Sequence, residues 1–180
     1  MKTSFQSARL LLALTLLTGG LYPLAVWAVG HVCFRDAAEG SQLRRNGRLV
    51  GSALLAQKND DPRYFWARPS AGDYATVASG ASNQGWTNAK LAAAVTERRN
   101  ALGDSPDLLA ASGSGLDPHL SPAAVLAQAA RVSRSRQLGA AQQVALNDLI
   151  ARHVEGGQIT PARVNVLRLN LAVDTAFPLP

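Results

Sequence analysis

The chain has 180 residues, of which 47% are hydrophobic, so it is long enough for one domain with a buried core and a short accessory element. Its formal net charge is +6, but the charges are scattered and aromatic residues make up only 6%, which argues against a nucleic-acid-binding protein. The single cysteine, Cys33, excludes an internal disulfide, and the histidines are too far apart in sequence to show metal-ligand spacing.

Residues 10–29 form an uncharged apolar run that predicts a transmembrane helix. At about 1.5 Å per residue, this run just crosses a hydrocarbon core of about 30 Å. A cleaved signal peptide, with a cleavage site at Val26-Trp27-Ala28, is the alternative. The run is long for a signal peptide, which favours a retained anchor. The predicted organisation is a short N-terminus (1–9), a transmembrane helix (10–29) and a single domain (31–180).

One face of this helix carries small and hydroxyl side chains. Thr15, Thr18, Gly19 and Tyr22 share the face, and small residues four apart allow another helix to approach closely. Thr15 and Gly19 are therefore candidates for contact with a partner helix. The alternative is a lone anchor whose threonine hydroxyls bond to its own backbone. Basic residues flank both ends of the span, so the positive-inside rule does not fix its orientation.

The region after the anchor predicts a hairpin, an aromatic segment and a loop. Residues 42–57 read as two strands around Asn46-Gly47, a dipeptide typical of a tight hairpin turn. The three adjacent aromatic residues 64–66 cannot all face one core from a strand, because strand side chains alternate. Residues 72–86 are rich in Gly, Ser and Asn and predict an ordered loop.

Helices dominate the remainder of the predicted domain. The predicted helices cover residues 87–102, 122–138 and 140–154; glycine follows the first two directly, and Gly156-Gly157 stops the third. Alternation of Leu167, Leu169, Leu171 and Val173 with polar or small neighbours predicts a strand over residues 163–174. A helix pair with a short turn is typical of helix-turn-helix DNA readers, but the final strand argues against that fold. The expected fold is an α/β (α+β) soluble domain preceded by one N-terminal transmembrane helix.

The most constrained stretch is Ala110 to Pro122, A-A-S-G-S-G-L-D-P-H-L-S-P. Its glycines, Gly113 and Gly115, permit backbone angles that a Cβ forbids. Asp117 and Ser121 each precede a proline, a pattern that predicts a helix cap followed by a helix start. Such a stretch serves either chemistry or docking.

The chemical interpretations of this stretch are weak. A phosphate-binding P-loop requires a lysine, and no lysine follows Lys90. A serine hydrolase using Ser114, Asp117 and His119 would require a G-x-S-x-G elbow, whereas Ser114 lies directly between two glycines. The residues favour a glycine-rich turn that leads into a capped helix, with His119 as a hydrogen-bonding tether.

Several stretches, in the right order, together resemble the C subunit of the bacterial high-affinity potassium-transporting P-type ATPase, the Kdp system. They are the span ending near Tyr22-Pro23 and residues 51–57, 64–71, 79–83, 87–88, 111–122, 163–167 and 169–174. The stretch 111–122 is the most specific of them. The departures are small: residues 59–62 are longer and more acidic than expected, and Trp86 stands where the family often has proline.

The resemblance implies a non-catalytic subunit with one inner-membrane span and a periplasmic domain. The implied partners are a potassium-selective channel-like subunit, a P-type ATPase pump subunit, a small single-span subunit and the lipid bilayer, without nucleic acid. ATP, Mg and potassium would be handled by the partner subunits, and no cofactor, metal or catalytic residue is expected in this chain. A catalytic-chaperone role in ATP binding is assigned to the family, but it conflicts with an external domain. A stabiliser or lid at the external ion entrance fits better, and the positive charge argues against a simple cation funnel.

The residue patterns and the resemblance together give a set of candidate partner-contact or structural residues. They are Thr15, Gly19, Tyr64, Phe65, Arg68, Asn83, Ser112, Gly113, Ser114, Gly115, Asp117, His119, Asn165 and Asn170.

Overall fold

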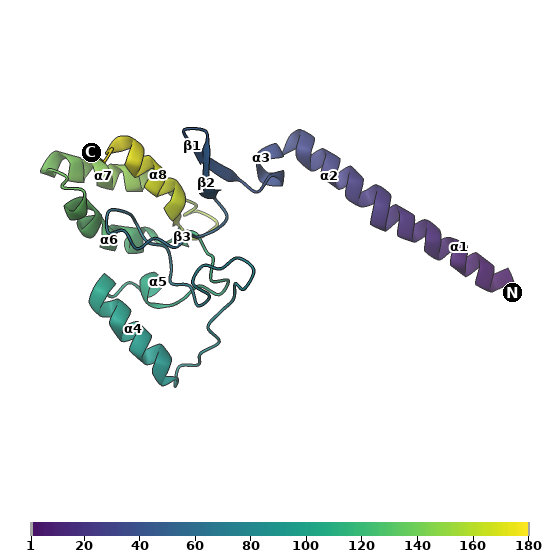
Figure 1. Ribbon diagram of the computed structural model, residues 1–180, viewed down its shortest axis with the longest axis horizontal. Coiled ribbons are helices and arrows are strands. Elements are labelled where there is room, and N and C mark those ends of the chain that lie inside the picture. Colours follow the sequence, from purple (N-terminus) through teal and green to yellow (C-terminus); the bar gives the residue numbers. More distant parts are fainter. Residues whose placement is uncertain (1, 180) are drawn as a thin grey trace. The chain divides into compact units, whose positions relative to one another are not determined.

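The computed structural model describes residues 2–179 as two units, which divide after residue 42 and are described separately. The N-terminal unit is a continuous helix built from α1 (Lys2–Leu16), a π-helical turn η1 (Leu17–Leu21) and α2 (Tyr22–Cys33), followed by the short α3 (Arg35–Ala38) (Figure 1). The stretch Lys2–Cys33 is long and apolar enough to cross a membrane. No residue of its most apolar part is buried by other parts of the structure. The predicted apolar helix over residues 10–29 is confirmed as part of this longer helix.

The π-helical turn lies within the face predicted to meet a partner helix. A π-turn widens the helix locally, and such turns are frequent at functional positions. The Thr18 hydroxyl donates to the Leu14 carbonyl oxygen at 2.7 Å. A hydroxyl bonded to its own helix backbone is what the alternative of a lone anchor predicts. Contact of Thr15 and Gly19 with another helix stays a prediction.

The predicted hairpin is formed by β1 (Gln42–Arg45) and β2 (Arg48–Ser52), and all of it except Gln42 belongs to the C-terminal unit. Asn46 and Gly47 have φ values of 51° and 77°, and two consecutive positive φ values are those of the type I′ turn that suits twisted strands. The second strand ends at Ser52, earlier than the predicted limit at residue 57. Residues 53–88 contain no helix or strand, which confirms the predicted loop at 72–86.

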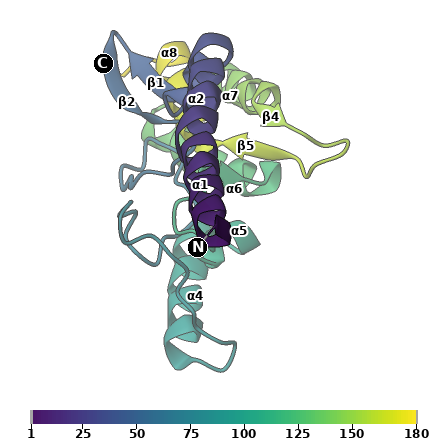
Figure 2. The same cartoon turned by 90° about the vertical axis from the view of Figure 1, so that its right-hand side faces the viewer.

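Short helices and a small sheet form the rest of this unit. They are α4 (Ala89–Leu102), α5 (Pro106–Leu109), β3 (His119–Leu120), α6 (Pro122–Ser135), α7 (Ala140–Arg152), β4 (Val154–Glu155), β5 (Arg163–Asn165) and α8 (Val166–Ala176). The sheet is antiparallel with the order β3-β5-β4, and His119 lies opposite Asn165. The turn between β4 and β5 extends away from the sheet (Figure 2). The fold is thus a mixture of helices and sheet, as expected.

One apolar core holds these elements together. It combines Phe65, from the segment without regular structure, with side chains spaced at three and four residues on the helices. These side chains include Val125 and Val132 of α6, Leu146 and Ile150 of α7, and Leu169 and Val173 of α8.

The predicted strand over residues 163–174 is wrong beyond its first three residues. Only Arg163–Asn165 is extended, and Val166–Ala176 is helical. The residues that this helix buries are Val166, Leu169, Asn170, Val173 and Asp174, which follow the helical period rather than the alternating leucines. Asn165 starts the helix, because its side chain accepts a hydrogen bond from the Arg168 N–H at 3.1 Å.

The two predicted caps in the constrained stretch have different outcomes. Ser121 caps α6 as predicted, since its hydroxyl accepts a hydrogen bond from the Ala124 N–H at 3.3 Å. The prediction that a helix starts at Pro118 is wrong, because the chain enters β3 and the Pro118 carbonyl accepts from the Val166 N–H at 2.9 Å.

Two helix ends also differ from the prediction. Helix α6 ends at Ser135 instead of residue 138, since Gln137 adopts a left-handed φ of 56°. Helix α7 ends at Arg152 instead of residue 154, because Val154 pairs with Val164 in the sheet.

Candidate functional site

A pair of amide side chains clamps the backbone of the aromatic segment. Asn170 of α8 accepts a hydrogen bond from the Phe65 N–H and donates one to the Phe65 carbonyl, both at 2.9 Å. Gln128 of α6 does the same for Trp66, with distances of 2.9 and 3.0 Å. We call Asn170 and Gln128 the amide clamp. It replaces the missing neighbouring strand, because each amide satisfies both backbone groups of one residue.

The clamp fixes which aromatic side chain enters the core. The peptide groups of Phe65 and Trp66 are held from two different helices, and the Phe65 ring is fully buried. The Trp66 ring remains half-buried. This arrangement explains how three adjacent aromatic residues are accommodated without all facing one core.

Arg131 of α6 also supports the clamp, through hydrogen bonds to Gln128 and to the residues that precede Phe65. It donates to the carbonyls of Pro62 and Tyr64 at 2.7 and 3.1 Å, and to Gln128 Oε1 at 2.6 Å. Its guanidinium carbon lies 3.8 Å from the Trp66 ring centre, which is a cation–π contact. Burial lowers the pKa of Arg131 to about 10, so it remains charged at neutral pH.

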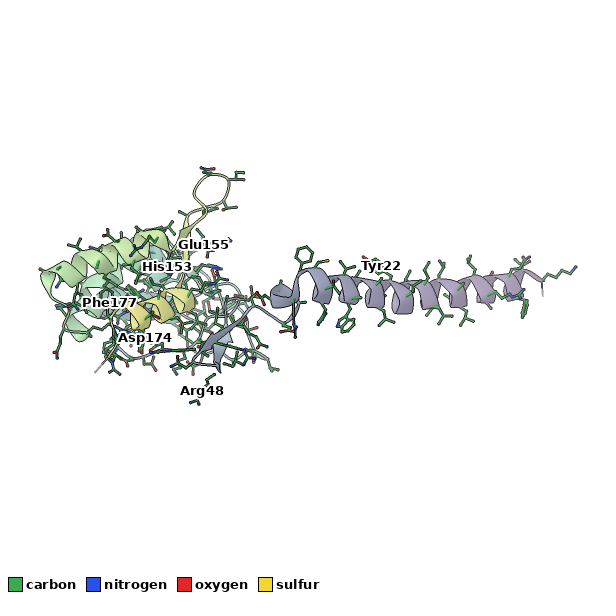
Figure 3. All side chains as sticks on the ribbon, turned by 90° about the horizontal axis from the view of Figure 1, so that it is seen from above. Tyr22, Arg48, His153, Glu155, Asp174 and Phe177 are labelled. Carbon is green, nitrogen blue, oxygen red and sulfur yellow. The ribbon has the colours of Figure 1, made fainter. Side chains whose placement is uncertain are left out.

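A buried ion pair also holds the start of the aromatic segment. Arg136 donates to Asp174 Oδ1 at 2.6 Å, and the two side chains are 1% and 6% exposed. Arg136 also donates to the Arg63 carbonyl at 2.7 Å, and the Tyr64 hydroxyl donates to Asp174 Oδ2 at 3.1 Å. Arg45 of β1 pairs with the same carboxylate, so Asp174 links α8 to the first hairpin. Figure 3 labels Asp174 on α8. Removing one partner would leave a buried charge uncompensated.

The constrained stretch is held in place by backbone hydrogen bonds to residues 53–88. The Ser112 N–H donates to the Pro69 carbonyl at 3.0 Å, and the Leu116 carbonyl accepts from the Ala56 N–H at 2.9 Å. Gly115 has a φ of +71°, and a Cβ there would lie 3.0 Å from the Gly80 carbonyl oxygen. Glycine is therefore required at this close approach.

The polar side chains of this loop bind neighbouring groups of the loop itself. The Ser114 hydroxyl accepts from the Leu116 N–H at 3.1 Å. Asp117 Oδ1 accepts from the His119 N–H at 3.0 Å and lies 3.2 Å from His119 Nδ1. Arg68 Nη1 lies 3.7 Å from the second Asp117 oxygen. Ser114 thus stabilises a turn and His119 is tethered to Asp117, whereas a serine nucleophile requires a hydrogen bond to its base.

The structure brings together half of the candidate residues in two groups. Tyr64, Phe65 and Asn170 lie at or beside the clamp, and Arg68, Asp117 and His119 form a second group beside Asn165, whose amide donates to the Ala53 carbonyl at 2.7 Å. The remaining candidates are the buried Ser112 and Gly115, the exposed Gly113, Ser114 and Asn83, and Thr15 and Gly19 in the N-terminal unit. Within residues 2–179, no group of three His, Cys, Asp or Glu side chains could hold a metal ion.

Sequence reasoning missed the residues that complete the site. Gln128 lies on the buried face of α6, four residues from both Ala124 and Val132. A polar residue at this position of an apolar helix face is the feature of the sequence that could have identified it. The predicted strand includes Asp174, and it therefore does not place this residue on the helix face that contacts Arg136.

Comparison with known proteins gives consistent matches along the chain. The KdpC family, described as "K+-transporting ATPase, c chain", matches residues 4–175. A potassium-transporting ATPase KdpC subunit of Sorangium cellulosum is 50% identical, covering 93% of this chain and 94% of the relative. Proteins of the same description from Leptospira interrogans and Dechloromonas aromatica are 46% and 43% identical, covering 95% and 97% of this chain and 93% and 98% of their own lengths.

The amide clamp generates a stability prediction. Replacing Asn170 by Leu leaves the buried N–H and carbonyl of Phe65 without partners, and each unsatisfied group costs about 1–3 kcal/mol. We expect Asn170→Leu to lower the free energy of unfolding by about 2–5 kcal/mol in urea denaturation of the detergent-solubilised chain. Asn100→Leu, at an exposed position of α4, is the matched control and should change it by less than about 0.5 kcal/mol. Equal stability of the two variants would contradict the clamp.

The constrained loop generates a second prediction, which compares its two glycines. Gly115→Ala meets both a positive φ and the Gly80 carbonyl, whereas a Cβ on Gly113 meets no described atom within 4 Å. We expect Gly115→Ala to destabilise the chain by about 1–3 kcal/mol and Gly113→Ala to be nearly neutral. Thermal unfolding followed by circular dichroism measures both, and a Gly113 variant as unstable as the Gly115 variant would refute this account.

Proposed function

The chain belongs to the KdpC family, the c chain of K⁺-transporting ATPases, and we propose that it is a non-catalytic accessory subunit that assembles and stabilises the potassium-uptake complex. The observation that carries this proposal is that the polar side chains of the constrained loop bond to the loop itself. Ser114, Asp117 and His119 bind groups of their own loop. Such an arrangement supports a rigid docking domain rather than a reaction centre.

The proposed partners are the channel-like potassium-selective subunit, the P-type ATPase pump subunit and the small single-span subunit. Candidate contact residues lie on both units: Thr15 and Gly19 on the apolar helix, and exposed Asn83 in the loop before α4. Tyr64, Phe65, Arg68, Asn165 and Asn170 instead hold the domain together.

We place the domain on the periplasmic side of the inner membrane, held there by the apolar helix. ATP is cytoplasmic, so the catalytic-chaperone role assigned to the family would then act on the pump subunit indirectly, through assembly. A position at the external ion entrance agrees with an anchored domain. Because residues 31–180 carry 16 basic and 12 acidic residues, a net charge of +4, the domain would serve there as a stabiliser or lid rather than as a funnel for cations.

The assembly role predicts a loss of complex when the chain is absent. With a tag after Pro180, mild detergent extraction should recover the channel-like and pump subunits together with the chain. Deleting the chain should abolish potassium-stimulated ATPase activity and growth at limiting potassium. Ser114→Ala should fold, assemble and support growth, because its hydroxyl serves only a turn. Normal transport without the chain would overturn the assignment, and a Ser114→Ala chain that assembles but cannot support growth would revive the hydrolase alternative.

The proposed topology makes a separate prediction that uses the only cysteine. Cys33 is exposed at the end of α2, so a membrane-impermeant maleimide added to spheroplasts should label it. In the matched control, Cys33→Ser combined with Ser4→Cys, the label should react only after the membrane is opened. The reverse pattern would place the domain in the cytoplasm.

A further inference from the structure

The β1–β2 hairpin carries a concentration of positive charge that the site described above uses only in part. Arg44, Arg45 and Arg48 lie within five consecutive residues around its turn. Residues 40–59 as a whole contain these three arginines and Lys58, and no acidic side chain. A segment of one sign in a chain whose other charges are mixed suits an anionic partner.

The three arginines of the hairpin differ in what they contact. Arg45 pairs with Asp174 and so fixes the hairpin to α8. The Arg48 side chain is exposed and forms no ion pair within residues 2–179, and Figure 3 shows it directed outward from the hairpin. Arg44 is also exposed, and its Nη1 donates to the Gly47 carbonyl at 3.5 Å, inside the hairpin itself. Arg48 therefore presents its charge to solvent, and Arg44 adds a second exposed charge beside it.

Exposed leucines accompany these charges. Leu49, next to Arg48, is 51% exposed, and Leu54 and Leu55, which follow β2, are 58% and 37% exposed. Basic side chains beside exposed apolar ones are typical of surfaces that lie on a membrane, because the apolar groups enter the boundary of headgroups and acyl chains while the cations remain at the phosphates. A free anion or a nucleic acid would give the leucines no apolar contact.

Chain connectivity keeps the hairpin close to the membrane surface. Arg35 is the first charged residue after the apolar run, so this surface lies near the end of the apolar helix. The linker that follows is compact, since the Ser41 N–H donates to the Asp36 carbonyl at 2.7 Å. Arg44 follows Ser41 by three residues, which limits the separation of their Cα atoms to about 11 Å. The potential of an anionic membrane decays over a Debye length of about 8–10 Å, so it still attracts arginines that begin this close to it.

We propose that the β1–β2 hairpin binds the phosphate groups of anionic phospholipids, with Arg44 and Arg48 at the phosphates and Leu49 in the interface. The proposal rests on the membrane anchoring that is part of the proposed function, and it holds for either orientation of the anchor. The planar guanidinium group of arginine matches phosphate in geometry as well as in charge. Because Arg45 ties the hairpin to α8, lipid binding here orients the domain on the bilayer.

The first test follows the hairpin in membranes of known composition. The full-length chain with Cys33→Ser and Leu49→Cys carries a fluorophore at position 49, in nanodiscs of phosphatidylcholine alone or mixed equally with phosphatidylglycerol. We expect phosphatidylglycerol to protect the fluorophore several-fold from acrylamide, an uncharged quencher, and about 0.5 M sodium chloride to remove this protection. The matched control carries the label at position 144 through Val144→Cys, exposed on α7, and should show no dependence on phosphatidylglycerol.

The outcomes of this test separate the two proposals. A chain that enters nanodiscs but shows no effect of phosphatidylglycerol at position 49, or an equal effect at position 144, would overturn lipid binding alone. A chain that does not insert into the bilayer would overturn it together with the anchored subunit of the proposed function. Displacement of the hairpin by inorganic phosphate, but not by chloride at the same ionic strength, would indicate a site for a free anion and overturn lipid binding.

The second test removes the charges in matched pairs. Arg44→Gln with Arg48→Gln changes the hairpin, and Arg134→Gln with Arg152→Gln removes the same charge from exposed positions of α6 and α7. One arginine near an anionic surface contributes about fivefold to binding. We therefore expect the hairpin pair to reduce the ratio of protected to accessible fluorophore by about tenfold or more, and the control pair to change it by less than about twofold. Equal effects of the two pairs would show a response to net charge only and overturn the proposal.

The third test identifies the occupant in the assembled complex. A photo-reactive benzoylphenylalanine replaces Leu49 or, as the control, Val144, and intact cells are irradiated. We expect an adduct with phospholipid at position 49 and none at position 144. An adduct of position 49 with another subunit in place of lipid would assign the hairpin to subunit assembly, and that result, or the absence of any adduct, would overturn the proposal.

Discussion

The fold of the C-terminal unit depends on satisfying the backbone of a long segment that has no strand or helix of its own. Residues 53–88 cross the domain without regular structure, and their buried N–H and carbonyl groups need partners. The amide clamp supplies them where the segment is deepest, at Phe65 and Trp66. Because Gln128 and Asn170 come from α6 and α8, the same hydrogen bonds also fix these helices against each other. The position of the Phe65 ring in the core follows from this constraint.

Arginines extend the same principle to the three residues that precede the clamped pair. Arg131 binds the carbonyls of Pro62 and Tyr64, and Arg136 binds the carbonyl of Arg63. Their charges are balanced differently, since Arg136 has Asp174 while Arg131 lies over the Trp66 ring. Part of the basic character of this chain, at Arg131 and Arg136, is therefore structural. A composition that first suggests an anionic partner is partly explained by guanidinium groups that bind backbone carbonyls.

Local signals in the sequence predict the elements whose causes are local. The Asn46-Gly47 turn, the Ser121 cap and the apolar N-terminal helix depend on neighbouring residues, and all three are present. The strand prediction over residues 163–174 failed because leucines at alternate positions also fit a helix whose buried face is completed by Asn170 and Asp174. These polar residues are buried because of partners about 105 and 38 residues away in sequence, Phe65 and Arg136. No local pattern reports such pairings, so the clamp could not be predicted from propensity or periodicity.

The buried polar groups of this domain are not all satisfied to the same degree. At the clamp, each amide side chain both donates and accepts, so that surface is complete within the chain. At the constrained loop and on α6, three buried atoms have no hydrogen-bond partner within residues 2–179: Arg68 Nε, Ser112 Oγ and Ser133 Oγ. A buried polar atom without a partner costs about 1–3 kcal/mol, so these atoms weaken the domain, whereas the paired amides of the clamp strengthen it.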